Sequence, residues 1–267
     1  EVRKVTDTNA AAKIGVTMQA WGAAEVVNAT LRTKERSLQA TIRQDVSGAI
    51  GHYLWPSSVV TADYILRELA GKSQGTRRAL ELGSGCGLVA MALALAGYEV
   101  TATDKATVLP LLQQNLFVFE EQLAVEGTRP ATHTAAFEWS EQLPEALSSV
   151  QFDLVVCCDC LYASTAVDPL LDALRSVSLV SFILASHNKT SPHSDAQQIT
   201  APDTEVIICN EQRSAFDGFL TLLRKEFDVQ DVALSESDLV VYRDLERREV
   251  VSTPVRLLTG KRRAASA

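Results

Sequence analysis

Two groups of residues have the types and the spacing to do chemistry. The first is the glycine-rich run at residues 81–87, Glu-Leu-Gly-Ser-Gly-Cys-Gly, followed further along the chain by Asp104. A residue without a Cβ can take a tight turn and let the main chain touch a ligand, so Gly83 and Gly85 predict a binding loop. The carboxylate of Asp104 can accept hydrogen bonds from both hydroxyls of a ribose. Together these residues predict a site for a cofactor that carries adenosine.

The second group is Asp159 and Tyr162, which follow the apolar run Phe152 to Cys158. In an open parallel sheet, ligands bind beyond the carboxyl ends of the strands, where both side chains would emerge. A carboxylate and a phenol placed there can orient an amine by hydrogen bonding and cation–π contact. The alternative is structural: Asp159 caps the next helix and Tyr162 packs beneath it.

The spacing of the glycines separates two classes of cofactor. The dinucleotide fingerprint is G-x-G-x-x-G, whereas here Gly87 comes one residue early and Leu88 stands at the expected place. A dinucleotide therefore fits less well. The acidic Glu81 before the turn suits the positively charged sulfonium and amino-acid part of S-adenosylmethionine. A glycine-rich turn without any ligand is the remaining alternative.

An α/β domain of the Rossmann type must position these residues. A strand at residues 76–82 leads into the loop, and an apolar helix at 88–96 follows it and ends at Gly97. A second strand at 98–104 carries Asp104 at its end. Further strands are predicted at 131–137, 152–158 and 206–209, helices at 59–69 and 216–227, and a closing pair of strands at 227–234 and 239–244, the last of them antiparallel.

The two ends of the chain and one internal stretch lie outside this pattern. Residues 1–37 predict an N-terminal appendage with some helix, and residues 38–245 the main domain. Residues 178–200 read as an insertion before the fifth strand. Residues 246–267 read as a C-terminal tail, in which the basic cluster 261–263 is a solvated end.

Two tryptophans flank the predicted crevice in the sequence. Trp55 precedes the helix at 59–69, and Trp139 follows the strand at 131–137. An indole covers apolar surface with its face while its N–H reaches a polar partner, which suits an adenosine pocket. Taken singly, each tryptophan is better explained as part of the core.

Composition narrows the function. The chain has 267 residues, 46% of them hydrophobic, and a net charge of −8, which argues against a general nucleic-acid binder. Cys157, Cys158 and Cys160 lack the spacing and the nearby histidine of a zinc site, so no metal is expected. Five cysteines and no secretory or membrane-spanning segment indicate the cytosol, or else the nucleus. Because the sequence begins at Glu1, an upstream signal stays open.

Five motifs occur in a specific order: Leu-Trp-Pro-Ser-Ser at 54–58, Glu-Leu-Gly-Ser-Gly-Cys-Gly-Leu at 81–88, Thr-Asp at 103–104, Glu-Trp at 138–139 and Asp-Cys-Leu-Tyr at 159–162. In this order they resemble methyltransferase family 16, the seven-β-strand protein lysine methyltransferases. The family has members similar to the lysine methyltransferases that act on valosin-containing protein and on elongation factors. The resemblance covers about residues 38–245. It implies a Rossmann-like class I methyltransferase fold, with a mostly parallel twisted sheet, an antiparallel last strand and helices on both faces.

The resemblance also implies roles for individual residues. Contacts to the cofactor, S-adenosylmethionine, would come from Trp55, Gly83, Ser84, Gly85, Asp104, Trp139 and Cys158, with Glu81 beside them. Asp159 and Tyr162 match the catalytic D-x-x-Y signature. The expected partner is a protein substrate, such as a translation factor or a chaperone, with no nucleic acid and no membrane, and the protein is expected to be a monomer.

The predicted chemistry is in-line attack by a neutral lysine amine on the methyl group of the sulfonium. Three alternatives stay open, namely a small-molecule methyltransferase, a protein-histidine methyltransferase and a non-catalytic module that binds the cofactor. Methylation of a nucleic-acid base is less favoured, because Cys160 and Leu161 replace the two prolines that shape the slot for a planar ring.

Overall fold

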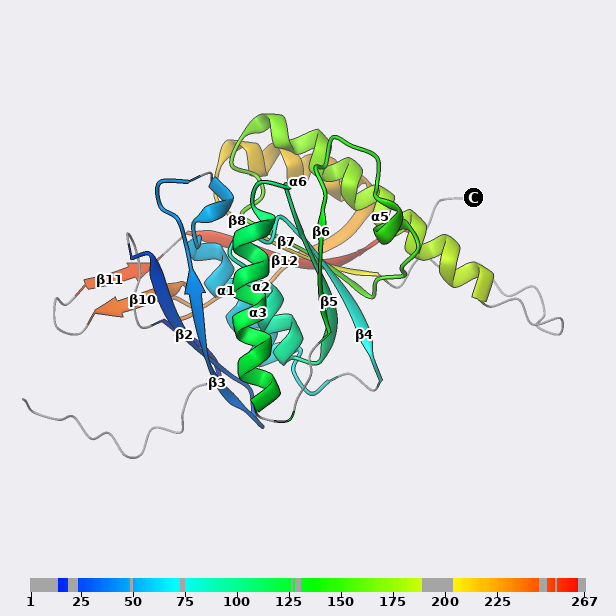
Figure 1. The fold of residues 1–267 in the computed structure, drawn as a ribbon. Coiled ribbons are helices and arrows are strands. Elements are labelled where there is room, and N and C mark those ends of the chain that lie inside the picture. The colour runs from blue at the N-terminus through cyan, green and yellow to red at the C-terminus, as the bar shows by residue number, and fades with distance from the viewer. Residues whose placement is uncertain are drawn as a thin grey trace, which may run out of the picture.

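The fold was analysed in a computed structural model, which describes residues 14–18, 24–48, 50–72, 75–125, 127, 131–188, 204–244, 249–252 and 254–263. A seven-stranded sheet runs through the centre, with helices on both faces (Figure 1). Its strands are β4 (Arg77–Leu82), β5 (Tyr98–Asp104), β6 (Thr132–Ala136), β7 (Leu154–Cys158), β8 (Glu205–Glu211), β9 (Phe227–Asp231) and β12 (Val255–Arg262). The predicted α/β Rossmann-like class I fold is confirmed.

The strand order is β6-β5-β4-β7-β8-β12-β9. Strands β4 to β8 pair in parallel, while β12 lies antiparallel between β8 and β9. The chain proceeds outward from β4 through β5 to β6, and then returns to the other side of β4 as β7. This reversal opens a crevice at the carboxyl ends of β4 and β7, which is where open α/β sheets bind ligands.

Helices cover the two faces of the sheet and enclose two apolar cores (Figure 1). One face carries α1 (Pro56–Glu68), α2 (Leu88–Leu95) and α3 (Leu109–Val125), and the other carries α4 (Glu145–Ser148), α5 (Val167–Asn188) and α6 (Ser214–Glu226). All five residues of β7 are buried. Leu154 and Val156 face the first core, and Val155 and Cys157 face the second. A strand covered on both faces must be apolar throughout, which explains why its sequence does not alternate.

The closing pair of strands differs from the prediction in its second member. β9 lies where the first was expected, but β10 (Val240–Asp244) pairs with β11 (Glu249–Ser252) in a separate two-stranded sheet. The antiparallel strand of the main sheet is β12, from the region predicted to be a tail. Its hydrophobic residues Leu257 and Leu258 are 1% and 0% exposed, and they complete the two cores. The same strand contains Lys261, whose amine lies 3.7 Å from Glu205, so the basic cluster is not a free end.

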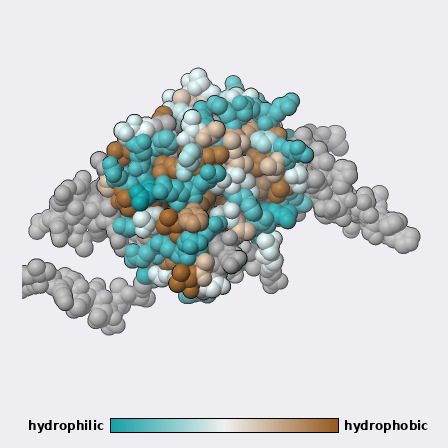
Figure 2. Space-filling model, in the orientation of Figure 1, coloured by the Kyte–Doolittle hydropathy of each residue, from teal (hydrophilic) through white to brown (hydrophobic). Residues whose placement is uncertain are grey.

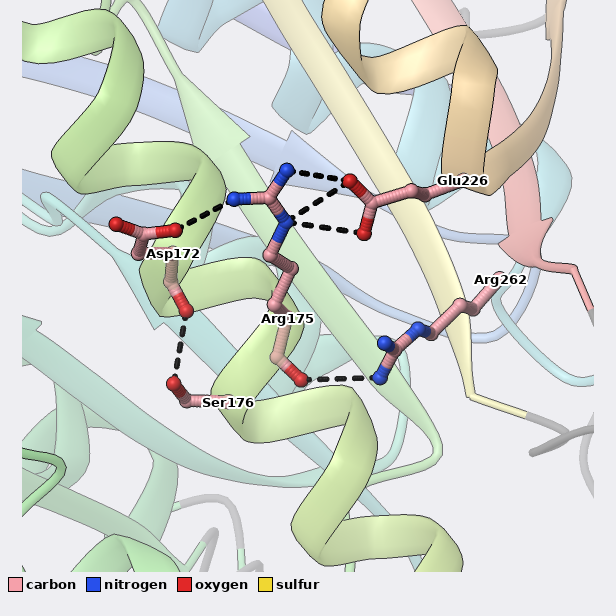
Figure 3. Close-up of polar contacts among 5 residues, drawn as sticks. All are labelled: Asp172, Arg175, Ser176, Glu226 and Arg262. Atoms are coloured by element: carbon pink, nitrogen blue, oxygen red, sulfur yellow. Dashed lines mark hydrogen bonds and ion pairs between the residues drawn. The ribbon is translucent and has the colours of Figure 1, made fainter. Parts of the chain in front are cut away.

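A polar cluster ties the end of β12 to α5 and α6 (Figure 3). The guanidinium of Arg175 on α5 donates to both carboxylate oxygens of Glu226 at the end of α6, and to Asp172 at 2.6 Å. Arg262 donates to the main-chain carbonyl of Arg175 at 3.2 Å, and the N–H of Arg263 donates to the carbonyl of Glu226 at 2.7 Å. Bidentate arginine–carboxylate pairs are geometrically specific, so this cluster fixes where the last strand ends.

The N-terminal region is a β-sheet rather than the partly helical appendage that was expected. β1 (Gly15–Met18), β2 (Val26–Arg32) and β3 (Ser37–Arg43) form a three-stranded antiparallel sheet, which crosses the predicted boundary at residue 38. Alternate residues of β2 and β3 are buried, the pattern of a sheet with one face on the core. The carboxylate of Asp63 on α1 anchors the sheet by accepting the N–H of Val16 at 3.0 Å.

The stretch predicted as an insertion begins as helix. Residues 178–188 continue α5 without a break, and the remainder of the predicted insertion lies outside the described residues. Within the described parts of the chain, no helix is both long and apolar enough to cross a bilayer. Figure 2 shows small hydrophobic areas separated by hydrophilic residues on the face that it presents.

Candidate functional site

A cavity of about 650 Å³ lies at the carboxyl ends of the parallel strands. It brings together most of the residues that were predicted to contact a cofactor or a substrate. These are Trp55, Gly83, Gly85, Asp104, Trp139, Cys158, Asp159 and Tyr162. They come from segments separated by up to half the chain, so the topology of the sheet, rather than sequence proximity, assembles this site.

The glycine turn forms the floor of the cavity. Gly83 and Gly85 have φ angles of +74° and +51°, which side chains with a Cβ rarely adopt. A Cβ at Gly83 would lie 2.9 Å from the sulfur of Cys160 and 3.1 Å from the indole of Trp139. The main-chain N–H groups of Gly83 and Ser84 donate to the carbonyl of Thr103 at 2.9 Å, which fastens the turn to β5. The turn is therefore a fixed cradle with no room for side chains.

Asp104 links the end of β5 to this cradle. Its Oδ2 accepts the N–H of Gly85 and its Oδ1 accepts the N–H of Lys105, both at 2.8 Å. Burial raises the pKa of Asp104, and the two N–H donors act in the opposite direction. A carboxylate has about four acceptor positions, so capacity remains for hydroxyl donors from a ligand in the cavity.

Glu81 and Ser84 do not line the cavity. Glu81 is 1% exposed and Ser84 is 7% exposed, and both side chains lie behind the turn. The reason is the alternation of β4, which directs the side chain of Glu81 into the interior beside α2. Burial raises the pKa of Glu81 to about 8. The predicted direct contact of these two side chains with a cofactor has no support in this geometry.

Two tryptophans form facing parts of the wall. Trp55 precedes Pro56, the first residue of α1, and its indole N–H donates to the carbonyl of Ile50 at 3.0 Å. Its ring meets that of Tyr53 edge to face, with centroids 5.1 Å apart. Trp139 packs against the second core and against the floor at Gly83. Both rings are partly exposed to the cavity, so they can cover a flat ligand group.

Asp159 has the most unusual backbone in the site. Its φ is +53°, a value that no other non-glycine residue takes among the described parts of the chain. The N–H of Asp159 donates to the carbonyl of Cys209 at 2.8 Å, and its Oδ1 lies 3.4 Å from the N–H donor of Glu211. Strained conformations of this kind cluster where a side chain must point into a site.

The other carboxylate oxygen of Asp159 is available. Oδ2 is buried and has no hydrogen-bond partner among the described residues. Burial raises the pKa of Asp159, and the nearby Ser57 and Arg213 act in the opposite direction. An unpartnered buried acceptor is rare in folded proteins, and it indicates a donor that arrives with a ligand.

The cysteines near this strand end are structural in character. Cys158 lines the cavity, and its sulfur lies 3.3 Å from the hydroxyl of Thr61. The thiol of Cys160 donates to the carbonyl of Leu82 at 3.1 Å. Burial raises the pKa of both thiols well above the usual range. They therefore act as small apolar wall residues rather than nucleophiles.

Several lining residues were not singled out from the sequence. Gly51 lies over the floor, where a Cβ would come within 2.9 Å of Val108, and its carbonyl faces Gly85. Lys105 and Glu138 form a 3.0 Å ion pair at the rim. A glycine just before the Leu-Trp-Pro motif was the only local signal for Gly51, whereas the ion pair joins two loops that only the folded sheet brings together.

The cavity combines a glycine cradle, a carboxylate after the second strand and a free acceptor after the fourth, an arrangement that could hold an adenosine-bearing cofactor at the carboxyl edge of a Rossmann-like sheet. The family model described as lysine methyltransferase matches residues 33–202. The chain belongs to this lysine methyltransferase family, and the cofactor of the family chemistry is S-adenosylmethionine. The resemblance found in the sequence is confirmed.

Two relatives of this chain are named protein N-lysine methyltransferases. The protein N-lysine methyltransferase METTL21A of Danio rerio is 27% identical over 73% of this chain and 77% of its own length. The mouse protein of that name is 27% identical over 78% of this chain and 84% of its own length. Among solved structures, a SAM-dependent methyltransferase from Agrobacterium tumefaciens matches 91% of this chain and 71% of that one, at 13% identity and a TM-score of 0.48.

Proposed function

We propose that this protein transfers the methyl group of S-adenosylmethionine to the side-chain amine of a lysine in a protein substrate. Family membership and the names of its relatives support the reaction class. The proposal depends above all on the position and state of Asp159. It stands at the end of β7 in a strained backbone conformation, lines the cavity of the glycine cradle, and keeps one buried carboxylate oxygen without a partner.

The residues of the cavity fit the cofactor. Gly83 and Gly85 line the cavity with main chain alone, so a ligand can approach the backbone of the turn, and Asp104 offers acceptor positions for ribose hydroxyls. Trp55 and Trp139 can cover the adenine, and the carboxylates of the cavity favour a cation. When bound, S-adenosylmethionine supplies an electrophilic methyl group on a positively charged sulfur.

The chain then has to deliver a neutral amine in line with that methyl. A free lysine has a pKa of about 10.4, and a low-dielectric site beside a cation favours the deprotonated form. Asp159 Oδ2 can accept a hydrogen bond from the amine and so orient its lone pair toward the donor carbon. No covalent intermediate on the protein is required, so alignment and exclusion of water are the tasks of this site.

The mouth of the cavity supports a side chain as the entering group. Tyr162 and Ile50 line the cavity and are 41% and 52% exposed, so apolar surface reaches from the interior to the solvent. A long aliphatic stem with a polar tip matches such a passage, because its methylene groups contact the rim while the amine reaches Asp159. We take the target to be a folded or extended segment of another protein, acted on by a monomer in the cytosol, where the five free cysteines would stay reduced.

The class of substrate is tested by incubating the purified protein with S-adenosylmethionine that carries a radioactive methyl group and a cytosolic extract. Labelled species are separated and identified by mass spectrometry. Label on a lysine of a protein supports the proposal. Label on histidine, in RNA or in a small metabolite would replace it with another reaction, and cofactor binding without transfer to any species would identify a binding module.

Asp159→Asn tests the role of the carboxylate. Asparagine tolerates a positive φ better than alanine does, so the backbone should survive while the charge is lost. We expect methyl transfer to fall at least about a hundredfold with binding of S-adenosylmethionine retained. Asp168→Asn removes an exposed carboxylate from the first turn of the neighbouring helix α5 and serves as the matched control. Equal transfer by both variants would contradict the assignment.

A further inference from the structure

A second buried polar group without a partner lies beside Asp159. The hydroxyl oxygen of Ser57 and Oδ2 of Asp159 are both buried, and neither meets a partner in full hydrogen-bond geometry among the described residues, yet hydrogen bonding from Ser57 lowers the pKa of Asp159. Ser57 as a whole is 0% exposed. Buried polar atoms without partners destabilise a fold, so a donor and an acceptor of this kind close together need an explanation.

The position of Ser57 follows from the packing of α1 on the sheet. One turn further along the same helix face, Thr61 contacts the sulfur of Cys158 at 3.3 Å, at the last residue of β7. Residues four apart in a helix lie one above the other, which places Ser57 next to the residue that follows Cys158 in the chain. That residue is Asp159, and the hydrogen bonding of Ser57 that lowers the pKa of Asp159 agrees with this placement.

We propose that Ser57 is a positioning residue, which donates its hydroxyl to one lone pair of Asp159 Oδ2, leaves the other lone pair to accept the substrate amine, and so holds this carboxylate in line with that amine. This inference rests on the proposed function. A serine hydroxyl reaches a neighbouring acceptor by rotation about its Cα–Cβ bond, without movement of the main chain. The hydroxyl thereby orients the carboxylate from the side opposite the cavity, because Ser57 does not line the cavity and Asp159 does.

The charges around Asp159 make this donor important. Glu211 on β8 raises the pKa of Asp159, and Arg213, which donates to Glu211 at 2.5 Å, lowers it. The thiols of Cys158 and Cys160 face the carboxyl from its own segment and are neutral. Because the arginine is already engaged by Glu211, the hydroxyl of Ser57 is a neutral side-chain donor that can favour the ionised form of Asp159.

The chain offers a matched pair of substitutions. Ser57→Ala removes the proposed donor, whereas Ser58→Ala removes the next hydroxyl, which already donates to the carbonyl of Trp55 at 2.6 Å. Ser57→Cys keeps the volume of the side chain but replaces the hydroxyl by a much weaker donor. Ser57→Cys tests the same hydroxyl without the cavity that alanine leaves, in case that cavity disturbs the fold. Thermal melting of all three variants shows whether each one is folded.

The first measurement needs neither cofactor nor substrate. The carboxyl of Asp159 is titrated by NMR in purified protein labelled with ¹³C-aspartate, and Asp159→Asn assigns its signal. We expect Ser57→Ala and Ser57→Cys to raise the pKa of Asp159 by about one unit, and Ser58→Ala to leave it unchanged. An unchanged titration of Asp159 in a folded Ser57→Ala protein would overturn the inference.

The second measurement follows transfer of labelled methyl to the protein band of the extract. The acidic limb of the rate profile should move to higher pH by about one unit in both Ser57 variants, with kcat lower and the KM for S-adenosylmethionine unchanged. Equal profiles for Ser57→Ala and Ser58→Ala would refute the positioning role. Absence of transfer by the wild-type protein would instead refute the proposed function, while the NMR titration still decides whether Ser57 and Asp159 interact.

Discussion

Replacing Gly83 by alanine tests whether the glycine turn is the floor of the cofactor site. The substitution has two separate effects. It places a Cβ on a residue with φ of +74°, and it puts that Cβ 2.9 Å from the sulfur of Cys160, a separation that real Cβ contacts essentially never show. The sulfur cannot retreat freely, because its thiol donates to the carbonyl of Leu82 at 3.1 Å. The turn or the ring of Trp139 must therefore shift.

The two effects have different magnitudes and different readouts. A left-handed conformation at a residue with a Cβ costs about 1–2 kcal/mol of folding free energy. Movement of the floor or of Trp139 acts on ligand binding as well, and we expect the affinity for S-adenosylmethionine to fall by about 10- to 100-fold, or about 1.4 to 2.8 kcal/mol. The loss of affinity for S-adenosylmethionine in Gly83→Ala should exceed any loss of affinity caused by backbone strain at a glycine far from the site.

Gly97 provides the control. Its φ is +98°, but a Cβ there would meet nothing within 4 Å. Gly97→Ala should therefore lower the free energy of unfolding by the strain alone and leave cofactor binding intact. Isothermal titration calorimetry with S-adenosylmethionine and with its demethylated product measures the affinity, and urea unfolding measures the stability of both variants.

Unchanged affinity of Gly83→Ala for the cofactor and its product would contradict the assignment of the floor. If Gly83→Ala binds both ligands as tightly as the wild-type protein, while losing the same stability as Gly97→Ala, the turn is strained but does not support the cofactor. The cavity would then have to receive its ligand elsewhere along its wall.

Two further predictions concern stability. Burial raises the pKa of Glu81 from about 4.5 to about 8, so the native carboxyl keeps its proton at pH values where the unfolded chain has lost it, and stability falls as the pH rises through this interval. Glu81→Gln removes that dependence and should be more stable than wild type by a few kcal/mol at pH about 8.5, but not at pH about 4, in urea unfolding; parallel pH profiles would contradict the assignment. Arg175→Met should lower the free energy of unfolding by about 1 kcal/mol, because it removes the bidentate pair with Glu226 near the end of β12. Lys72→Met serves as the control. It breaks an exposed pair with Glu68 and should change the free energy of unfolding by less than about 0.5 kcal/mol. Equal thermal melting of these two variants would show that the cluster does not hold the last strand.

Local chemistry made the first half of the site predictable from the sequence. The strand β4, the glycine turn, the helix α2 and the strand β5 are consecutive, so short-range patterns within residues 77–104 indicate the type and order of these elements. Glycines specify the turn because no other residue takes these φ angles easily, and an apolar run indicates a strand covered on both faces. The positions of Asp104 and Asp159 at strand ends followed from the same pattern.

Only the tertiary structure decided which strand closes the sheet. The sequence predicted a strand at residues 239–244 and a tail after it, whereas both β10 and β12 are strands, and each one needs a partner to satisfy its main chain. β12 finds partners on both sides in β8 and β9, and it buries Leu257 and Leu258 in the two cores. Pairing between segments far apart in the chain leaves no local signal, which is why the basic end of this strand looked like a tail.

The same limit applies to the site. The sequence by itself determined the cradle, the carboxylate after the second strand and the acid–tyrosine pair after the fourth, because each is a short motif with its own physical reason. It did not determine that Glu81 turns into the interior, that Gly51 lies over the floor, or that Ser57 stands behind Asp159. Those relations depend on how α1 and the loop before it pack across the strand ends, and packing between distant segments is set by the whole core rather than by any short stretch of residues.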